Sequence, residues 1–168
     1  MKRIHALTAM AASLVMSTGA MAQQSSHEVA GQVSVTILPH DNITLTQVEA
    51  LRFGTLLPYG RDGYIVYHPN GSTSASNLLP TSDGGPSSWI VQGTSSAPFS
   101  IAFPAATQVV DGVGNTMTVN GFSRSGATNM ILNAAGEASF TIGAVLRVGA
   151  IQPAGDYNGS YQVTVAYN

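Results

Sequence analysis

Apolar and polar residues alternate one by one through residues 157–167. The odd positions, Gly159 excepted, are apolar or aromatic, and the even positions between them are polar or small. Successive side chains of a β-strand point to opposite faces, so this alternation predicts a strand with one buried face. An edge strand of that kind needs hydrogen-bonding partners and a cover for its apolar side. The inward positions would be Tyr157, Tyr161, Val163, Val165 and Tyr167.

A second alternating segment lies near the other end of the chain, at residues 29–37. Its even positions are Ala, Gln, Ser and Thr, and Pro39 ends the pattern. The segment is either the first strand of its own domain or a strand that is added to another copy of the protein, and the pattern alone leaves both open. In strand addition, backbone hydrogen bonds supply affinity and pockets for alternate side chains supply specificity. The odd positions are Val29, Gly31, Val33, Val35 and Ile37.

Short apolar segments separated by turn residues make up most of the remaining chain, and few windows show helical periodicity. The Asn-Gly and Asp-Gly pairs between them supply the backbone angles that tight turns require. Strands at this spacing predict a single all-β domain, a sandwich or a barrel. We predict strands at residues 29–38, 43–46, 51–56, 63–68, 88–92, 99–103, 116–122, 138–142, 145–150 and 157–166, with a long polar surface loop at 71–86.

The first 22 residues have the pattern of a signal peptide. Lys2 and Arg3 are followed by a mainly apolar stretch at residues 4–16, and Ala20 and Ala22 are the small residues that signal peptidase recognises. We expect cleavage before Gln23 and export of the mature chain. Because the apolar stretch is shorter than the ~20 residues of a spanning helix, we expect no stable membrane insertion.

The mature chain would carry little charge. It would keep four arginines, no lysine and eight carboxylates, and it has no cysteine to form a disulfide. The acidic balance argues against nucleic acids and anionic membrane surfaces as partners, since both demand clustered positive charge. Charged residues make up only 8% of the sequence, which suits a surface that is buried against neighbouring molecules.

No arrangement of residues in the sequence predicts catalysis or a cofactor. The histidines His27, His40 and His68 are not at the spacing of metal ligands. No serine lies in a Gly-x-Ser-x-Gly turn, and the sequence itself brings no pair of carboxylates together. We therefore expect no catalytic residue, no metal site, no cofactor and no enzyme activity.

Aromatic residues offer one further binding candidate. Trp89 could form a sugar-binding platform with Tyr59, Tyr64 and Tyr67. A lone tryptophan on a short strand of a small domain is more typical of the core, and we expect the core position.

Several motifs carry a resemblance to known families. The segment VAGQVSVTI at residues 29–37 resembles the N-terminal donor strand of archaic chaperone-usher pilins. The segment from Pro153 to Tyr167 resembles the final strand of those pilins and of spore-coat-U-like domains. The chain is also similar to an uncharacterised family of secreted bacterial fimbrial-like domains, through LRFGT at 51–55, GYIVY at 63–67, GAVLRV at 143–148 and GxYxG at 155–159.

This resemblance implies a subunit that is incomplete by itself. Such pilins are immunoglobulin-like β-sandwiches that lack their last strand and so expose a hydrophobic groove. A periplasmic chaperone fills the groove first, and the N-terminal extension of the next subunit replaces it at the outer-membrane usher. Residues 23–38 would be the donor-strand extension and residues 39–168 the β-sandwich. Val29, Gly31, Val33, Val35 and Ile37 would be the donor positions, and the odd residues of 157–167 would form one wall of the acceptor groove and the chaperone contact.

The resemblance implies the function of a structural subunit of a surface fimbria, or pilus. Identical copies would polymerise by donor-strand exchange, after export to the periplasm and assembly at the cell surface, and the filament would support cell adhesion or biofilm formation. Since the chain shows no additional N-terminal domain, a shaft subunit is expected. The alternative is a secreted, self-contained β-sandwich whose N-terminal strand closes its own sheet and which binds carbohydrate or protein.

Overall fold

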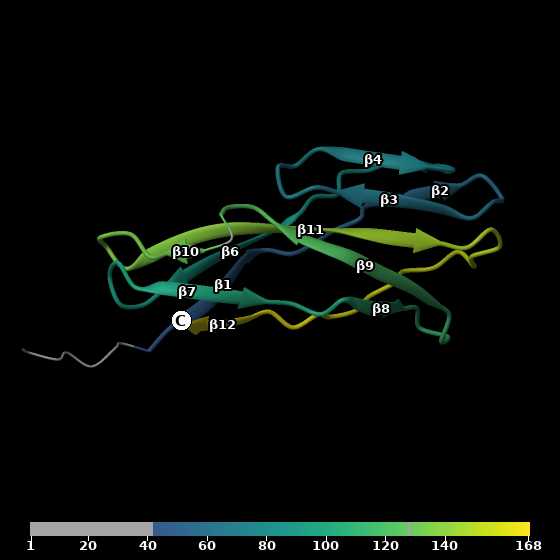
Figure 1. Ribbon diagram of the computed structural model, residues 1–168. Coiled ribbons are helices and arrows are strands. Elements are labelled where there is room, and N and C mark those ends of the chain that lie inside the picture. The colour runs from purple at the N-terminus through teal and green to yellow at the C-terminus, as the bar shows by residue number, and fades with distance from the viewer. Residues whose placement is uncertain (1–41, 128) are drawn as a thin grey trace, which may run out of the picture. The chain divides into compact units, whose positions relative to one another are not determined.

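The computed structural model describes residues 42–127 and 129–168 (Figure 1). These residues form β-strands and no helix, and every strand pair among them is antiparallel. The same part of the chain therefore holds no helix that could span a membrane. The prediction of an all-β fold is confirmed. The predicted signal peptide and the predicted strand at residues 29–38, with its donor positions, lie outside the described residues.

Most strands belong to one seven-stranded sheet, and a three-stranded sheet shares a hydrophobic cluster with it. The large sheet contains β1 (Thr44–Glu49), β3 (Gly63–Tyr67), β4 (Thr73–Ser76), β6 (Ser87–Gln92), β8 (Ala106–Val110), β9 (Thr116–Arg124) and β11 (Glu137–Val148). The small sheet contains β7 (Pro98–Ala102), β10 (Met130–Ile131) and β12 (Thr164–Tyr167). A separate two-stranded ladder pairs β2 (Leu56–Pro58) with β5 (Leu78–Pro80).

The long strand β11 is the centre of the large sheet. Along one edge it pairs first with β6 and then with β3, and its other edge pairs with β9. The sequence predicted two strands here, interrupted near Gly143, and that division is wrong because β11 runs through without a break. Gly143 is instead a position of close approach, where a Cβ atom would collide with the carbonyl oxygen of Tyr67. A glycine in a strand interior marks such an approach as readily as it marks a turn.

A bulge in β9 changes which of its residues face the core. Gly121 has a φ of 60°, and the register between β9 and β11 shifts at this point. Before the bulge Val119 is buried, and after it Phe122 takes the inward position and packs against both hydrophobic clusters of the fold. The extra residue of a bulge shifts the side-chain alternation by one position, so both residues can face the same core.

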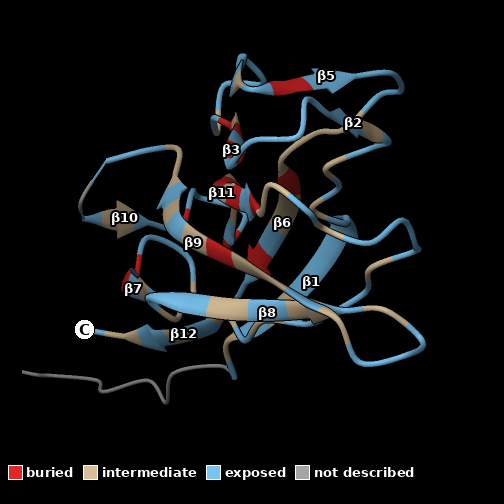
Figure 2. Ribbon diagram, turned by 90° about the vertical axis from the view of Figure 1, so that its right-hand side faces the viewer, coloured by how far each residue is buried: buried red, intermediate tan, exposed pale blue. Residues whose placement is uncertain are grey.

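Two clusters of buried residues follow one another along β11. Figure 2 shows buried segments on β3, β6, β9 and β11. We call the first the β3 cluster and the second the β12 cluster, after the strands that pack there. The β3 cluster consists of Ile65, Tyr67, Leu78, Val119, Ala144, Leu146 and Val148. The β12 cluster consists of Val91, Phe99, Leu132, Phe140 and Ile142, and Trp89 packs against it as expected of a core tryptophan.

Four strands did not show in the sequence pattern. The segment predicted as a long polar loop, residues 71–86, contains β4 and β5 and ends just before β6. β4 is an edge strand beside β3 with mostly exposed side chains, so its sequence TSAS needs no apolar alternation. The short strands β8 and β10 were also missed.

The predicted strand at residues 51–56 is wrong for most of its length. Within it only Arg52 forms a bridge, with Gly85, and β2 begins at Leu56. Leu51 and Phe53 leave the ladder and pack against the β3 cluster.

Candidate acceptor groove

The alternation that predicted the last strand is visible in how its residues are buried. Val163, Val165 and Tyr167 are half-buried and pack against the β12 cluster, and Tyr161 packs there too. The even residues between them are exposed. The apolar row therefore faces the core, as the sequence pattern predicted, but its side chains stay partly accessible.

The ladder itself is shorter than predicted, because β12 covers only Thr164–Tyr167. Upstream, Asn158 pairs with Val110 in an isolated bridge, and Thr107 Oγ1 donates to the carbonyl oxygen of Ser160 over 2.8 Å. Residues 157–167 thus begin beside β8 in the large sheet and end beside β7 in the small one. The segment crosses between the sheets, and this crossing prevents one continuous ladder.

Two unpaired strand edges border the β12 cluster. Within the described residues, β12 pairs with β7 alone and β1 pairs with β6 alone. Leu45 on β1 and Val165 on β12 pack against the same cluster from these two sides. An unpaired edge presents a row of backbone donors and acceptors to a further strand. The arrangement leaves room in the hydrogen-bonding pattern for one more strand beside β12.

Buried hydroxyl groups hold the apolar row in place. The hydroxyl of Tyr161 lies 2.6 Å from Ser87 Oγ, and Trp89 Nε1 donates to the same oxygen over 2.9 Å. Ser87 is fully buried. At the other end of the row, the backbone N–H of Thr94 donates to the hydroxyl of Tyr167 over 2.7 Å. These bonds fix the half-buried Tyr161 and Tyr167 in the row.

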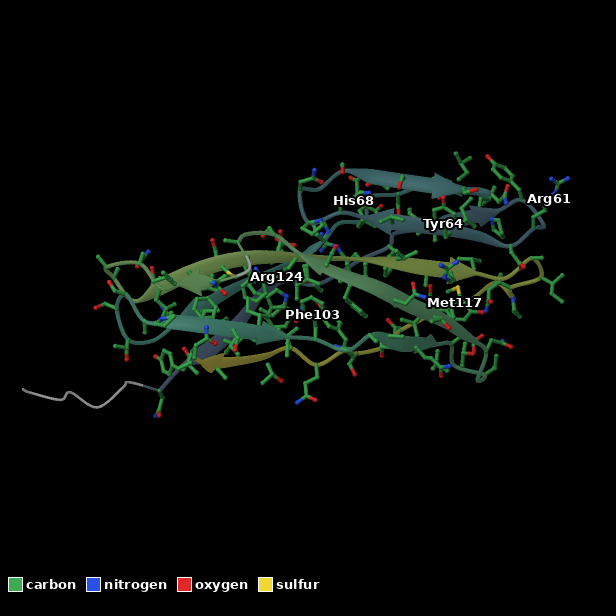
Figure 3. The ribbon with its side chains drawn as sticks, viewed as in Figure 1. Arg61, Tyr64, His68, Phe103, Met117 and Arg124 are labelled. Carbon is green, nitrogen blue, oxygen red and sulfur yellow. The ribbon has the colours of Figure 1, made fainter. Side chains whose placement is uncertain are left out.

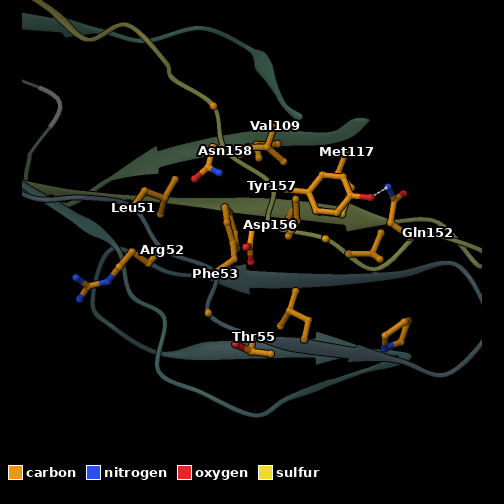
Figure 4. A pocket seen from close by; sticks show the side chains of 18 of the residues that line it. Leu51, Arg52, Phe53, Thr55, Val109, Met117, Gln152, Asp156, Tyr157 and Asn158 are labelled. Atoms are coloured by element: carbon orange, nitrogen blue, oxygen red, sulfur yellow. Dashed lines mark hydrogen bonds between the residues drawn. The ribbon is translucent and has the colours of Figure 1, made fainter. Parts of the chain in front are cut away.

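A cavity of about 920 Å³ continues from this row (Figure 4). One wall is residues 51–58, the opposite wall is residues 152–161, and Val119, Leu146 and Val148 of the β3 cluster also line it. Its labelled apolar side chains include Leu51, Phe53, Val109 and Met117. The cavity is therefore mainly a gap between two chain segments over an apolar floor.

Tyr157, another of the predicted site residues, lines this cavity. Its hydroxyl donates to the carbonyl oxygen of Pro153 over 2.8 Å and accepts from Gln152 Nε2 over 2.8 Å. Tyr161 lines the same cavity and also packs against the β12 cluster. The cavity and the apolar row thus share Tyr161, and we call the two together the edge groove.

The edge groove combines an apolar floor with mixed walls. Polar and charged residues, among them Arg52, Asp83 and Asp156, line the cavity beside the apolar ones, and Arg52 also forms an exposed ion pair with Glu49 at 3.5 Å. No cluster of three or more metal-binding side chains occurs among the described residues. An edge for hydrogen bonds and a row of apolar pockets are what an added β-strand requires.

The sequence pattern missed the wall opposite residues 157–161. Leu51 and Phe53 line the cavity, and the Phe53 ring meets Tyr67 edge-on with 6.0 Å between centroids. Both residues belong to the LRFGT segment at 51–55, in which they alternate. That alternation was the available signal, but it predicted a ladder strand rather than a cavity wall.

The aromatic platform considered from the sequence does not form. Trp89 stacks with Phe140 at 6.5 Å between ring centroids and meets Tyr161 at 6.3 Å, so it contributes to the core. Tyr67 is buried, whereas Tyr59 and Tyr64 are exposed. His68 is exposed at the end of β3 (Figure 3).

Comparison with known proteins gives one finding on identity. A family described as a domain of unknown function, DUF4402, has a model that matches residues 43–167. Neither the curated proteins nor the solved structures provide a match. The family match spans well over half of the chain and includes both walls of the edge groove, and the chain belongs to the DUF4402 family.

Proposed function

We propose that this protein is a structural subunit of a surface fimbria, and that identical copies assemble by donor-strand exchange. The observation that carries the proposal is the edge groove, an apolar row on a strand with one ladder partner among the described residues, in a chain that also contains a separate alternating segment. Residues 29–37 of one copy would occupy the groove of the next. The half-buried row on β12 would then be covered.

The donor segment and the groove match in length and chemistry. Nine extended residues span roughly 26 Å, and residues 157–167 span at most about 33 Å in an extended conformation. Val29, Val33, Val35 and Ile37 repeat every second residue, as side chains that enter one face must. Gly31 would let the donor backbone approach the groove closely.

The direction of the donor strand decides which copy can supply it. β1 begins near Tyr167, since Thr44 pairs with Gln92 and Thr94 bonds to Tyr167. From Ile37 to Ile43 the chain can reach about 20 Å at most. A strand antiparallel to β12 places Ile37 near Tyr157, up to about 33 Å from that starting point. Because this linker is shorter than the extended length of the groove segment, the geometry favours an antiparallel donor from another copy.

Antiparallel pairing is the arrangement that the fold favours. All nine ladders among the described residues are antiparallel. Antiparallel pairs are also slightly more stable per residue than parallel pairs. A self-closed monomer would pair its own residues 29–37 antiparallel with the edge of β1 and parallel with β12, so it forgoes the antiparallel pairing with β12 that an exchanged donor makes.

The expected stabilisation is large for a domain of this size. Burial of four Val or Ile side chains is worth roughly 6 to 12 kcal/mol before ordering costs. The net stability of a typical domain is about 5 to 15 kcal/mol. A subunit without donor or chaperone would therefore be marginally stable or would aggregate.

The remaining parts of the proposal follow from the same groove. The body would be an immunoglobulin-like sandwich, and a periplasmic chaperone would cover the groove until the outer-membrane usher exchanges it for the next donor strand. The finished filament at the cell surface would support adhesion or biofilm formation. These steps account for a predicted signal peptide, a low charge and an unpaired edge in one chain.

Deletion of residues 23–38 from the mature protein tests the proposal. We expect the truncated chain to lose polymerisation and to fold when a peptide of residues 29–37 is supplied, as followed by size-exclusion chromatography and circular dichroism. Two full-length variants give a matched comparison. Val33→Asp with Val35→Asp should abolish polymers, whereas Ser34→Asp with Thr36→Asp adds the same charge on the opposite face and should retain them.

The alternative, a self-contained secreted binding module, makes the opposite prediction. A stable wild-type monomer purified without any chaperone would contradict the filament. So would a truncated chain that stays unfolded whatever peptide is added.

A further inference from the structure

One end of the domain carries strongly exposed apolar residues at the tips of its turns. Tyr59 is 60% exposed, Val113 is 86% exposed and Ile151 is 94% exposed. They lie in the β2–β3 turn, the β8–β9 turn and the turn that follows β11. Turn tips usually carry Gly, Asn, Asp or Ser, so aliphatic side chains here are unusual.

Hydrogen bonds join these turns into one surface, which we call the turn cluster. Asp62 Oδ1 accepts from the backbone N–H of Ala150 over 2.9 Å. Gln152 Nε2 donates to the carbonyl oxygen of Thr116 over 3.4 Å. Arg61 projects from the same end (Figure 3). The exposed side chains thus stand on a connected frame.

Hydrogen bonds to the side chain of Asp111 stabilise the turn that contains Val113. The side chain of Asp111 accepts from the backbone N–H groups of Val113 at 3.0 Å and Asn115 at 2.7 Å, and from Asn115 Nδ2 at 2.6 Å. Val113 therefore cannot turn inward without loss of these bonds. Its exposure is a fixed feature of the turn.

The opposite end of the domain has a different surface. Its turns at residues 94–97 and 133–136 are closed by backbone hydrogen bonds, and the exposed residues at their tips are small or polar. These exposed residues are Ser95, Ser96, Asn133, Ala134 and Ala135. Ile131, which is 61% exposed, lies beside these turns on β10, but the described residues at the turn tips themselves include no large apolar side chain.

We propose that the turn cluster is covered by the body of the next subunit in the filament. This inference rests on the proposed function. An antiparallel donor leaves the groove at Tyr157, and Tyr157 is joined to the turn cluster through its hydrogen bond to Gln152. At most about 20 Å of chain separates Ile37 of the donor from Ile43 of its own body. That body therefore begins within about 20 Å of the donor's exit, on the side of the turn cluster.

In the next subunit, the surface that contacts the turn cluster would be the end of the domain that carries the start of β1. The small residues of the turns at 94–97 and 133–136 lie at that end, since Thr94 bonds to Tyr167 and Thr44 pairs with Gln92. Small side chains allow the exposed Val113 and Ile151 of one copy to approach the backbone of the next. Each subunit would thus present an apolar end to a neighbour's small-residue end.

Photocrosslinking of assembled filaments tests this contact. Benzoylphenylalanine replaces Ile151 in one variant and Ile90, which is 37% exposed on β6, in the control. We expect severalfold more subunit-to-subunit crosslinks from position 151 than from position 90, with the crosslinked peptides in residues 42–44, 94–97 or 133–136. Donor-strand insertion is measured in the same samples as detergent-resistant ladders on gels.

The outcomes separate the two proposals. Ladders with equal crosslinking from positions 151 and 90 would overturn the contact and leave donor-strand exchange standing. Crosslinks from position 151 to lipid or to an unrelated protein would also overturn it. Absence of ladders from the unsubstituted protein would overturn the proposed function itself.

Discussion

The two hydrophobic clusters along β11 are closed to different degrees. The β3 cluster has seven buried residues and six partly buried ones, whereas the β12 cluster has five buried and twelve partly buried. The same strand supplies both clusters, so the difference arises from what covers them. The excess of half-buried side chains shows that the β12 cluster is the less completely covered of the two among the described residues.

The cover of each cluster explains the contrast. Leu78, at the start of β5, is buried in the β3 cluster beneath the β2–β5 ladder. The β12 cluster has the short strand β12 on one side and β1 on the other, and neither has a second ladder partner among the described residues. The β3 cluster also has an open side, because Val119, Leu146 and Val148 line the cavity, so a strand in the edge groove would cover part of both clusters.

The largest expected effect on the free energy of unfolding comes from a fully buried residue of the β12 cluster, and a half-buried residue of the same cluster serves as the comparison. Phe99 is fully buried, so Phe99→Ala should lower the free energy of unfolding by about 3–5 kcal/mol at every donor concentration. Half-buried Val165 should behave differently. Val165→Ala should cost about 0.8 kcal/mol in the free domain and about twice that when a donor strand completes its burial.

Urea unfolding of residues 39–168 at several concentrations of a peptide of residues 29–37 measures both effects. The loss from Phe99→Ala should stay constant, and the loss from Val165→Ala should grow with peptide. A Val165→Ala effect that is the same at all peptide concentrations would mean that the β12 cluster is already complete.

Sequence alternation predicted the parts of the fold in which one face is buried. The strand GYIVY at 63–67 alternates between buried and more exposed positions, and it was placed within one residue of β3. The inward row of residues 157–167 was found in the same way. Alternation reports one-sided burial, so it succeeds where a strand covers a core.

Other elements depend on contacts that no local pattern records. β4 has almost no buried side chain, and it forms because β3 offers it an edge. Leu51 and Phe53 were predicted on a strand but line the cavity, because residues 152–161 lie opposite them. Gly143 resembles a turn signal locally, and only the backbone of Tyr67 explains it.

A second prediction concerns the junction between the two clusters. Gly143 lies on β11 between Ile142 of the β12 cluster and Ala144 of the β3 cluster. Gly143→Ala forces a Cβ atom against the carbonyl oxygen of Tyr67, and we expect a loss of about 1–3 kcal/mol in the free energy of unfolding. Gly85→Ala is the control, because no atom lies within 4 Å of a Cβ built at Gly85.

Thermal and urea unfolding of both glycine variants give the comparison. If the junction couples the clusters, Gly143→Ala should also weaken binding of the donor peptide, whereas Gly85→Ala should leave it unchanged. Equal stability of the two variants would show that β3 can move away from β11 without loss.

The smallest expected effect on stability comes from Asp111 in the turn cluster, beyond the end of the groove that lies at the β3 cluster. The hydrogen bond from the Asn115 side chain, helped by backbone N–H groups of the turn, lowers the pKa of Asp111 below its ordinary value of 3.8. A carboxylate with a lowered folded-state pKa stabilises the fold above its unfolded pKa, and this stabilisation is lost as the pH falls through the folded value. Asp111→Asn should therefore be less stable than the wild type at pH 7, and the difference should shrink toward pH 2.

Asn115→Ala removes the largest cause of the lowered pKa, so in that background Asp111→Asn should show a weaker pH dependence. Urea unfolding at both pH values measures the difference, and a gap of equal size at pH 7 and pH 2 would show that the charge of Asp111 does not stabilise the turn.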